Sequence, residues 1–110
     1  MDLVNELQYK IKELYKATEM SEFSGKKLAE AERDYKVLLR QECLKLKHDG
    51  MAVGMIDKTC YGIPEVAEKR FQRDVAEAVY KASQENINAI KLEIKIIESQ
   101  IQREYGNCKY

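Results

Sequence analysis

The sequence contains very few of the residues that interrupt regular secondary structure. Its 110 residues include one proline, five glycines and no tryptophan. A β-sandwich, a barrel or an α/β sheet needs many more turns than these residues can supply. Long apolar runs are also missing, so we expect no membrane-spanning helix. The first ten residues, MDLVNELQYK, carry acidic residues and no apolar core, so we expect no signal peptide.

An excess of charge of either sign is missing as well. Nineteen basic and nineteen acidic side chains cancel, which argues against bulk electrostatic binding to nucleic acid. The three cysteines, Cys43, Cys60 and Cys108, form neither a CxxC pair nor a disulfide framework, which predicts a reducing, cytoplasmic compartment. The single histidine, His48, supplies too few ligands for a histidine-based metal site. No phosphate-binding or nucleophile motif occurs, so we expect no metal, no cofactor and no catalytic activity.

What remains is a composition typical of long amphipathic helices. Charged residues make up 35% of the chain and hydrophobic residues 45%. In the C-terminal half, isoleucines recur at steps of three and four, the spacing of a coiled-coil seam: Ile87, Ile90, Ile94, Ile97 and Ile101. Pro64 suits the first turn of a helix, and Gly106 suits its end. We predict one helix over residues 64–105, followed by a tail at 106–110.

The N-terminal half repeats this pattern with one interruption. Leucines and isoleucine mark a stripe from Leu3 to Leu14, and a second stripe resumes at Leu28. Between them, Ser24 and Gly25 suggest a kink or a break. We predict helices over residues 2–21 and 25–49, with fusion into a single helix as the alternative.

The connector between the two halves is apolar for a loop. We expect a short helix over residues 52–60 that caps a long antiparallel hairpin, all within a single all-α domain of residues 1–110. A helix-turn-helix recognition unit is the alternative, but the basic residues that it needs are mostly absent. With the turn centred near residue 56, Ile11 is expected to meet Ile101.

Apolar residues also lie outside the predicted seam. Leu92, Ile96, Val37 and Tyr15 are of this kind, and a lone hairpin would leave them in contact with water. Because exposed apolar surface usually marks a partner, we expect a homo-oligomer, most simply a dimer that forms a four-helix bundle. The competing arrangement folds the N-terminal segment back as a third helix.

Two similar polar stretches, residues 29–42 and 68–81, bring arginine, aspartate and tyrosine together. In the hairpin, Tyr35 would face Arg70, Arg73 and Tyr80. The first interpretation is a polar layer that fixes the helix register. The second is a ligand-binding pocket in which arginine binds an anion and tyrosine stacks on a ring.

Three strings, AERDYK, VAEKRFQRDVAEAVY and IESQIQREYG, resemble small helical proteins encoded by phages and prophages of Gram-positive bacteria. The likeness covers residues 25–106. It implies an accessory role in early DNA metabolism or in counter-defence, and it carries over no functional residue. We therefore expect a non-catalytic binding protein that either inhibits a host immune protein or sequesters a nucleotide signal. A nucleic-acid or recombination accessory protein and a purely structural coiled coil are the alternatives.

Overall fold

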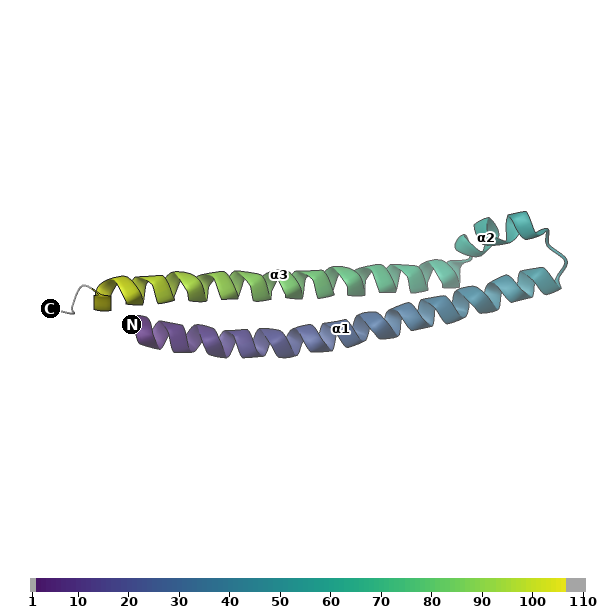
Figure 1. Ribbon diagram of the computed structural model, residues 1–110. Coiled ribbons are helices and arrows are strands. Elements are labelled where there is room, and N and C mark those ends of the chain that lie inside the picture. The colour runs from purple at the N-terminus through teal and green to yellow at the C-terminus, as the bar shows by residue number, and fades with distance from the viewer. Residues whose placement is uncertain (1, 107–110) are drawn as a thin grey trace. The chain divides into compact units, whose positions relative to one another are not determined.

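Three helices account for nearly all of the residues that the structure describes. The computed structural model describes residues 2–106, with α1 at Leu3–His48, α2 at Val53–Tyr61 and α3 at Pro64–Gly106 (Figure 1). No strand occurs within the described residues. The predicted all-α hairpin with a short connector helix is confirmed. The tail beyond residue 106, with Cys108, lies outside the described residues.

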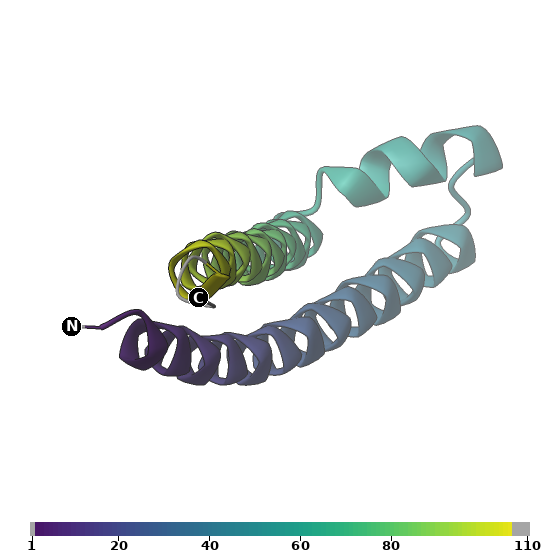
Figure 2. The same cartoon turned by 60° about the vertical axis from the view of Figure 1, so that its left-hand side comes forward.

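The chain divides into two compact units that share the two long helices. Unit 1 comprises the chain up to Phe23 and from Lys81 onward, and unit 2 comprises Ser24–Tyr80. In each unit, a segment of α1 lies beside an antiparallel segment of α3 (Figures 1 and 2). In unit 1, Ile90 and Ile97 are buried and the other isoleucines of the predicted seam are half-buried. This confirms the predicted seam.

The α1 helix is continuous through residues 22–24, so the prediction of separate helices over residues 2–21 and 25–49 is wrong, and the alternative of a single fused helix is correct. The seam of α1 continues there on small side chains, because Ala17, Ser21 and Ser24 are buried at steps of four and three. These residues preserve the helical phase but have small side chains, which explains why the apolar pattern of the sequence is interrupted here. The continuous helix also excludes the arrangement in which residues 2–21 fold back as a third helix.

The ends of the helices follow local backbone chemistry. Gly50 adopts a φ of 89° just after α1, a left-handed conformation that glycine adopts without strain. At the other side of the connector, α3 begins on Pro64, whose missing N–H has no helical partner to lose at this position.

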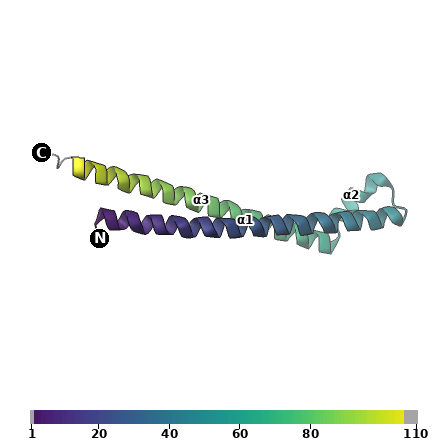
Figure 3. The same cartoon turned by 60° about the horizontal axis from the view of Figure 1, so that its bottom comes forward.

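The register of the hairpin differs from the prediction. A turn centred at residue 56 would place Ser21 opposite Lys91, but Gln84, seven residues away, donates a hydrogen bond to Ser21. The cause lies in unit 2, where α2 runs beside the last turns of α1 (Figure 3) and the Sγ atoms of Cys43 and Cys60 are 2.9 Å apart. Because α2 occupies the end of α1, α3 begins beside an earlier turn. A shift of one heptad leaves seam opposite seam.

Candidate functional site

Unit 2 contains a cluster of two arginines and two tyrosines, which we call the Arg–Tyr cluster: Tyr35, Tyr61, Arg70 and Arg73. Tyr35, on α1, is 3% exposed. The guanidinium carbon of Arg73, on α3, lies 4.6 Å from the centre of its ring, within the range of a cation–π contact. The arginine thus covers the face of a buried tyrosine.

The positive charge of Arg73 is also balanced by a carboxylate on its own helix. Its Nη2 lies 2.9 Å from Oδ1 of Asp74, and this hydrogen-bonded carboxylate raises the pKa of the arginine. With the carboxylate beside it and the Tyr35 ring beneath it, Arg73 fits the predicted polar layer that joins two helices. Its side chain remains 27% exposed, so the layer is open to solvent at this point.

Arg70 makes a different set of contacts, all to the end of α2. Its guanidinium carbon lies 4.8 Å from the centre of the Tyr61 ring, and its Nη1 donates a hydrogen bond of 3.3 Å to the Tyr61 carbonyl. Within residues 2–106, no carboxylate forms an ion pair with Arg70. Among these residues, no carboxylate therefore balances the positive charge of Arg70.

The Tyr61 hydroxyl links the two halves of the cluster. A hydrogen bond with Tyr35 raises the pKa of Tyr61, so the two phenols act as one polar unit between α1 and α2. Sequence reasoning did not include Tyr61, because its proximity to Tyr35 depends on how α2 folds back. A tyrosine at the predicted end of the connector helix was the only available signal.

Tyr80, the fourth predicted site residue, contacts a different part of α1. Its ring packs over Gly25, where an added Cβ would lie 3.0 Å from the Tyr80 Cε1 atom. Gly25, which suggests a break when the sequence is considered alone, has no side chain and so leaves room for this ring. The structure therefore brings Tyr35, Arg70 and Arg73 together and places Tyr80 two turns further along α3.

A second candidate surface is the face of α3 turned away from α1. In unit 1, Leu92 is 60% exposed and Ile96 is 51% exposed, and two exposed alanines, Ala82 and Ala89, share their face. In unit 2, Phe71 is 61% exposed and Val75 is 45% exposed. The expectation that Leu92 and Ile96 lie off the seam in contact with water is confirmed.

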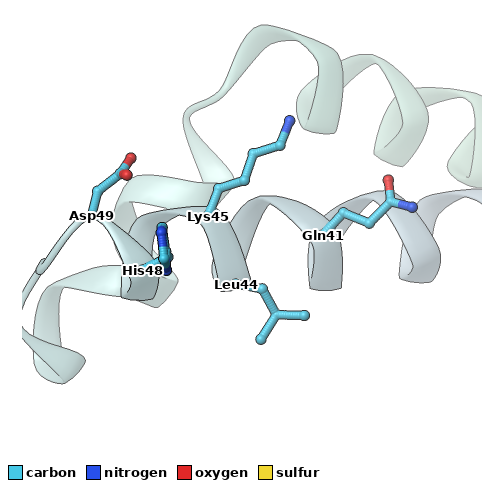
Figure 4. Close-up of a pocket in the computed structure, with 5 residues that line it drawn as sticks. All are labelled: Gln41, Leu44, Lys45, His48 and Asp49. Atoms are coloured by element: carbon cyan, nitrogen blue, oxygen red, sulfur yellow. The ribbon is translucent and has the colours of Figure 1, made fainter.

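His48 lies in the last turn of α1, where a cation is favoured by the helix dipole. It lines an open hollow of about 580 Å³ with Gln41, Leu44, Lys45 and Asp49. These residues come from successive turns of α1 and the residue after it (Figure 4).

Across residues 2–106, no group of three or more His, Cys, Asp or Glu side chains could hold a metal ion. Within the same residues, no helix is long and apolar enough to cross a membrane.

Comparison with protein-family models, with curated proteins and with solved structures gave no match.

Proposed function

We propose that this chain is a non-catalytic binding protein of the phage accessory type, and that its working form is a homodimer joined through α3. The observation that carries the proposal is the exposed apolar face of this helix. Phe71, Val75, Ala78, Ala82, Glu85, Ala89, Leu92 and Ile96 recur at steps of four and three. We call these eight positions the outer stripe. Their spacing is that of a second coiled-coil seam.

Two copies of the outer stripe match each other in the size of their side chains. Its large side chains stand at both ends, and its alanines lie near the middle. If two α3 helices pair antiparallel, Phe71 lies opposite Ile96 of the partner subunit. Val75 then lies opposite Leu92 of the partner subunit, and Ala78 opposite Ala89 of the partner subunit. Large residues therefore meet large residues along the pair, which is the self-complementary pattern of a two-fold interface.

The charges beside the outer stripe favour the same pairing. In the same register, the exposed Asp74 flanks the stripe and faces Lys95 of the partner subunit, and the two-fold axis repeats this pair. Flanking positions of this kind set partner choice and orientation in coiled coils. Glu85, the one charged residue in the outer stripe, lies near the axis, within reach of Lys81 of the partner subunit.

Light scattering coupled to gel filtration tests the proposal. We expect a native mass of twice the 12.8 kDa chain mass at micromolar concentration, and a lower average mass on dilution. A mass of 12.8 kDa at every concentration would contradict the homodimer. In that case, capture of a second protein by the same face would support a binding protein of another kind.

A second candidate function is the binding of a phosphate-bearing nucleotide at the Arg–Tyr cluster. The specific observation in its favour is Arg70, which lies on a tyrosine ring and has no carboxylate partner among the described residues. Guanidinium groups bind phosphate through paired N–H donors, and tyrosine rings stack on bases. This site would serve the sequestration of a nucleotide signal, one of the two modes of action that we expect from the sequence.

Isothermal titration calorimetry with a cyclic dinucleotide, a mononucleotide and inorganic phosphate tests the second candidate. Binding that is lost in Arg70→Ala and kept in Arg33→Ala would support it, because Arg33 is an exposed arginine outside the cluster. Absence of binding for all three probes would refute it. Binding of DNA with a steep salt dependence would instead favour the nucleic-acid accessory alternative.

A further inference from the structure

Two of the three cysteines lie side by side in unit 2. Cys43 is on the penultimate turn of α1, and Cys60 is on the last turn of α2. They are 17 positions apart in sequence, yet their Sγ atoms are separated by only 2.9 Å. Both are free thiols. Their proximity results from the packing of α2 against α1, so sequence spacing alone gave no sign of it.

The two thiols differ in their access to solvent. Cys60 is fully buried at 0% exposure, whereas Cys43 is half-buried. Burial, with a smaller effect of the hydrogen bond to Cys43, raises the pKa of the Cys60 thiol to about 11. Because the thiolate is the reactive form, an oxidant in solution reacts with Cys43 first.

We propose that Cys43 and Cys60 form a reversible disulfide within one chain, which joins α2 covalently to α1. A disulfide requires a separation of about 2.05 Å between its sulfur atoms. The two Sγ atoms therefore need to approach by less than about 1 Å, which is within the reach of side-chain rotation. This site is independent of the outer stripe on α3 and of the proposed homodimer.

The oxidant would be a low-molecular-weight disulfide of the glutathione type. The Cys43 thiolate attacks one of its sulfur atoms and forms a mixed disulfide, and the first small thiol leaves. Cys60 then loses its proton, its sulfur attacks Sγ of Cys43, and the second small thiol leaves. Overall, two electrons pass from the protein to the small disulfide, which is reduced to two thiols that carry the two protons.

The new bond would restrain an element that few contacts hold. In α2, only Ile56 and Cys60 are buried, and the N-cap residue Ala52 provides no side-chain hydrogen bond. Tyr61 follows Cys60 directly and supplies the carbonyl and ring that contact Arg70. Oxidation would therefore fix the α2 side of the Arg–Tyr cluster, and reduction would release it.

The experiment compares two variants in glutathione redox buffers, both carrying Cys108→Ser to remove the third thiol. In the variant with Cys43 and Cys60 intact, we expect intact mass to show the loss of two hydrogens, and peptide mapping to show a Cys43–Cys60 link. We also expect amide exchange in Val53–Tyr61 to slow at least tenfold and the melting temperature to rise by roughly 10 °C. The added Cys43→Ser change should abolish all four effects.

Two results would overturn the proposal. The first is a glutathione adduct on Cys43 that persists without transfer to Cys60, and the second is a disulfide that joins two chains. Circular dichroism of the Cys43→Ser variant guards against misfolding as a cause of a negative result. The reduced form of the variant with both thiols serves as a second reference, because it differs from the oxidised form only in the bond.

Discussion

Replacement of Leu92 by alanine should weaken the homodimer while leaving the fold of a single chain intact. Leu92 is 60% exposed in one copy, and the antiparallel pairing covers it with Val75 of the partner subunit. Full burial of a leucine side chain contributes about 1.5–3 kcal/mol. Burial of the exposed part therefore contributes about 1–2 kcal/mol per copy, and a dimer contains two copies. We expect a loss of about 2–4 kcal/mol, or a rise in the dissociation constant of roughly 30- to 1,000-fold.

A matched control is available on α1. Leu44 is 55% exposed and lies outside the outer stripe, so Leu44→Ala removes the same atoms from a similar environment. Sedimentation equilibrium measures the dissociation constant of each variant, and thermal melting checks the fold. If Leu44→Ala weakens the dimer as much as Leu92→Ala does, or if neither changes the dissociation constant, the outer stripe is not the interface.

Three further predictions concern the contacts of α3. Arg73→Ala should destabilise the fold by about 1–2 kcal/mol, from a lost cation–π contact and a partly exposed ion pair. Chemical denaturation measures this loss. Arg33→Ala breaks a similar neighbouring ion pair and should lower the free energy of unfolding by less. Gly25→Leu should destabilise by about 1–3 kcal/mol because the Tyr80 ring fills the space; an unchanged melting temperature would contradict that packing. Lys95→Glu should raise the dissociation constant of the dimer at low salt, and the difference from the wild type should shrink in 1 M salt.

The sequence was most informative where side chains are large and apolar. The isoleucines from Ile87 to Ile101 predicted the seam of α3 because each contributes a strong periodic signal. Pro64 and Gly106 predicted the two ends of α3 because their backbone preferences act locally. The same periodicity showed that Leu92 and Ile96 lie outside the seam, which the exposure of both side chains confirms.

The sequence was less informative where small or polar residues form the contact between helices. Ser21 and Ser24 are buried in the seam of α1, but serine and glycine are also typical of breaks, so two interpretations of one pattern competed. The register depended on the packing of α2 against the end of α1, which is a tertiary contact. The same contact brings Cys43 to Cys60 and Tyr61 to Tyr35, and neither pair has a spacing that would reveal it.

The Arg–Tyr cluster shows the limit of motif reasoning in this chain. Arginine and tyrosine at helical spacing correctly indicated that Tyr35 and Arg73 would meet. Tyr80 shares the same face of α3, yet it packs on Gly25, because residues two turns apart contact different turns of the opposite helix. The cluster gains Tyr61 from α2 instead. Arg70 and Arg73, which look equivalent in sequence, therefore have different partners and should respond differently to substitution.

The distance between the same residue in two copies tests the antiparallel homodimer most directly. Spin labels attached through a non-natural amino acid at position 82 or 96 leave the native cysteines unchanged. Position 82 lies near the two-fold axis, so its intermolecular distance should be roughly 10–20 Å. Ile96 lies opposite Phe71 of the partner subunit, about 25 residues along the helix, so labels at 96 should be roughly 40 Å apart. A short distance at position 96, or no intermolecular signal at either position, would contradict the homodimer proposed here.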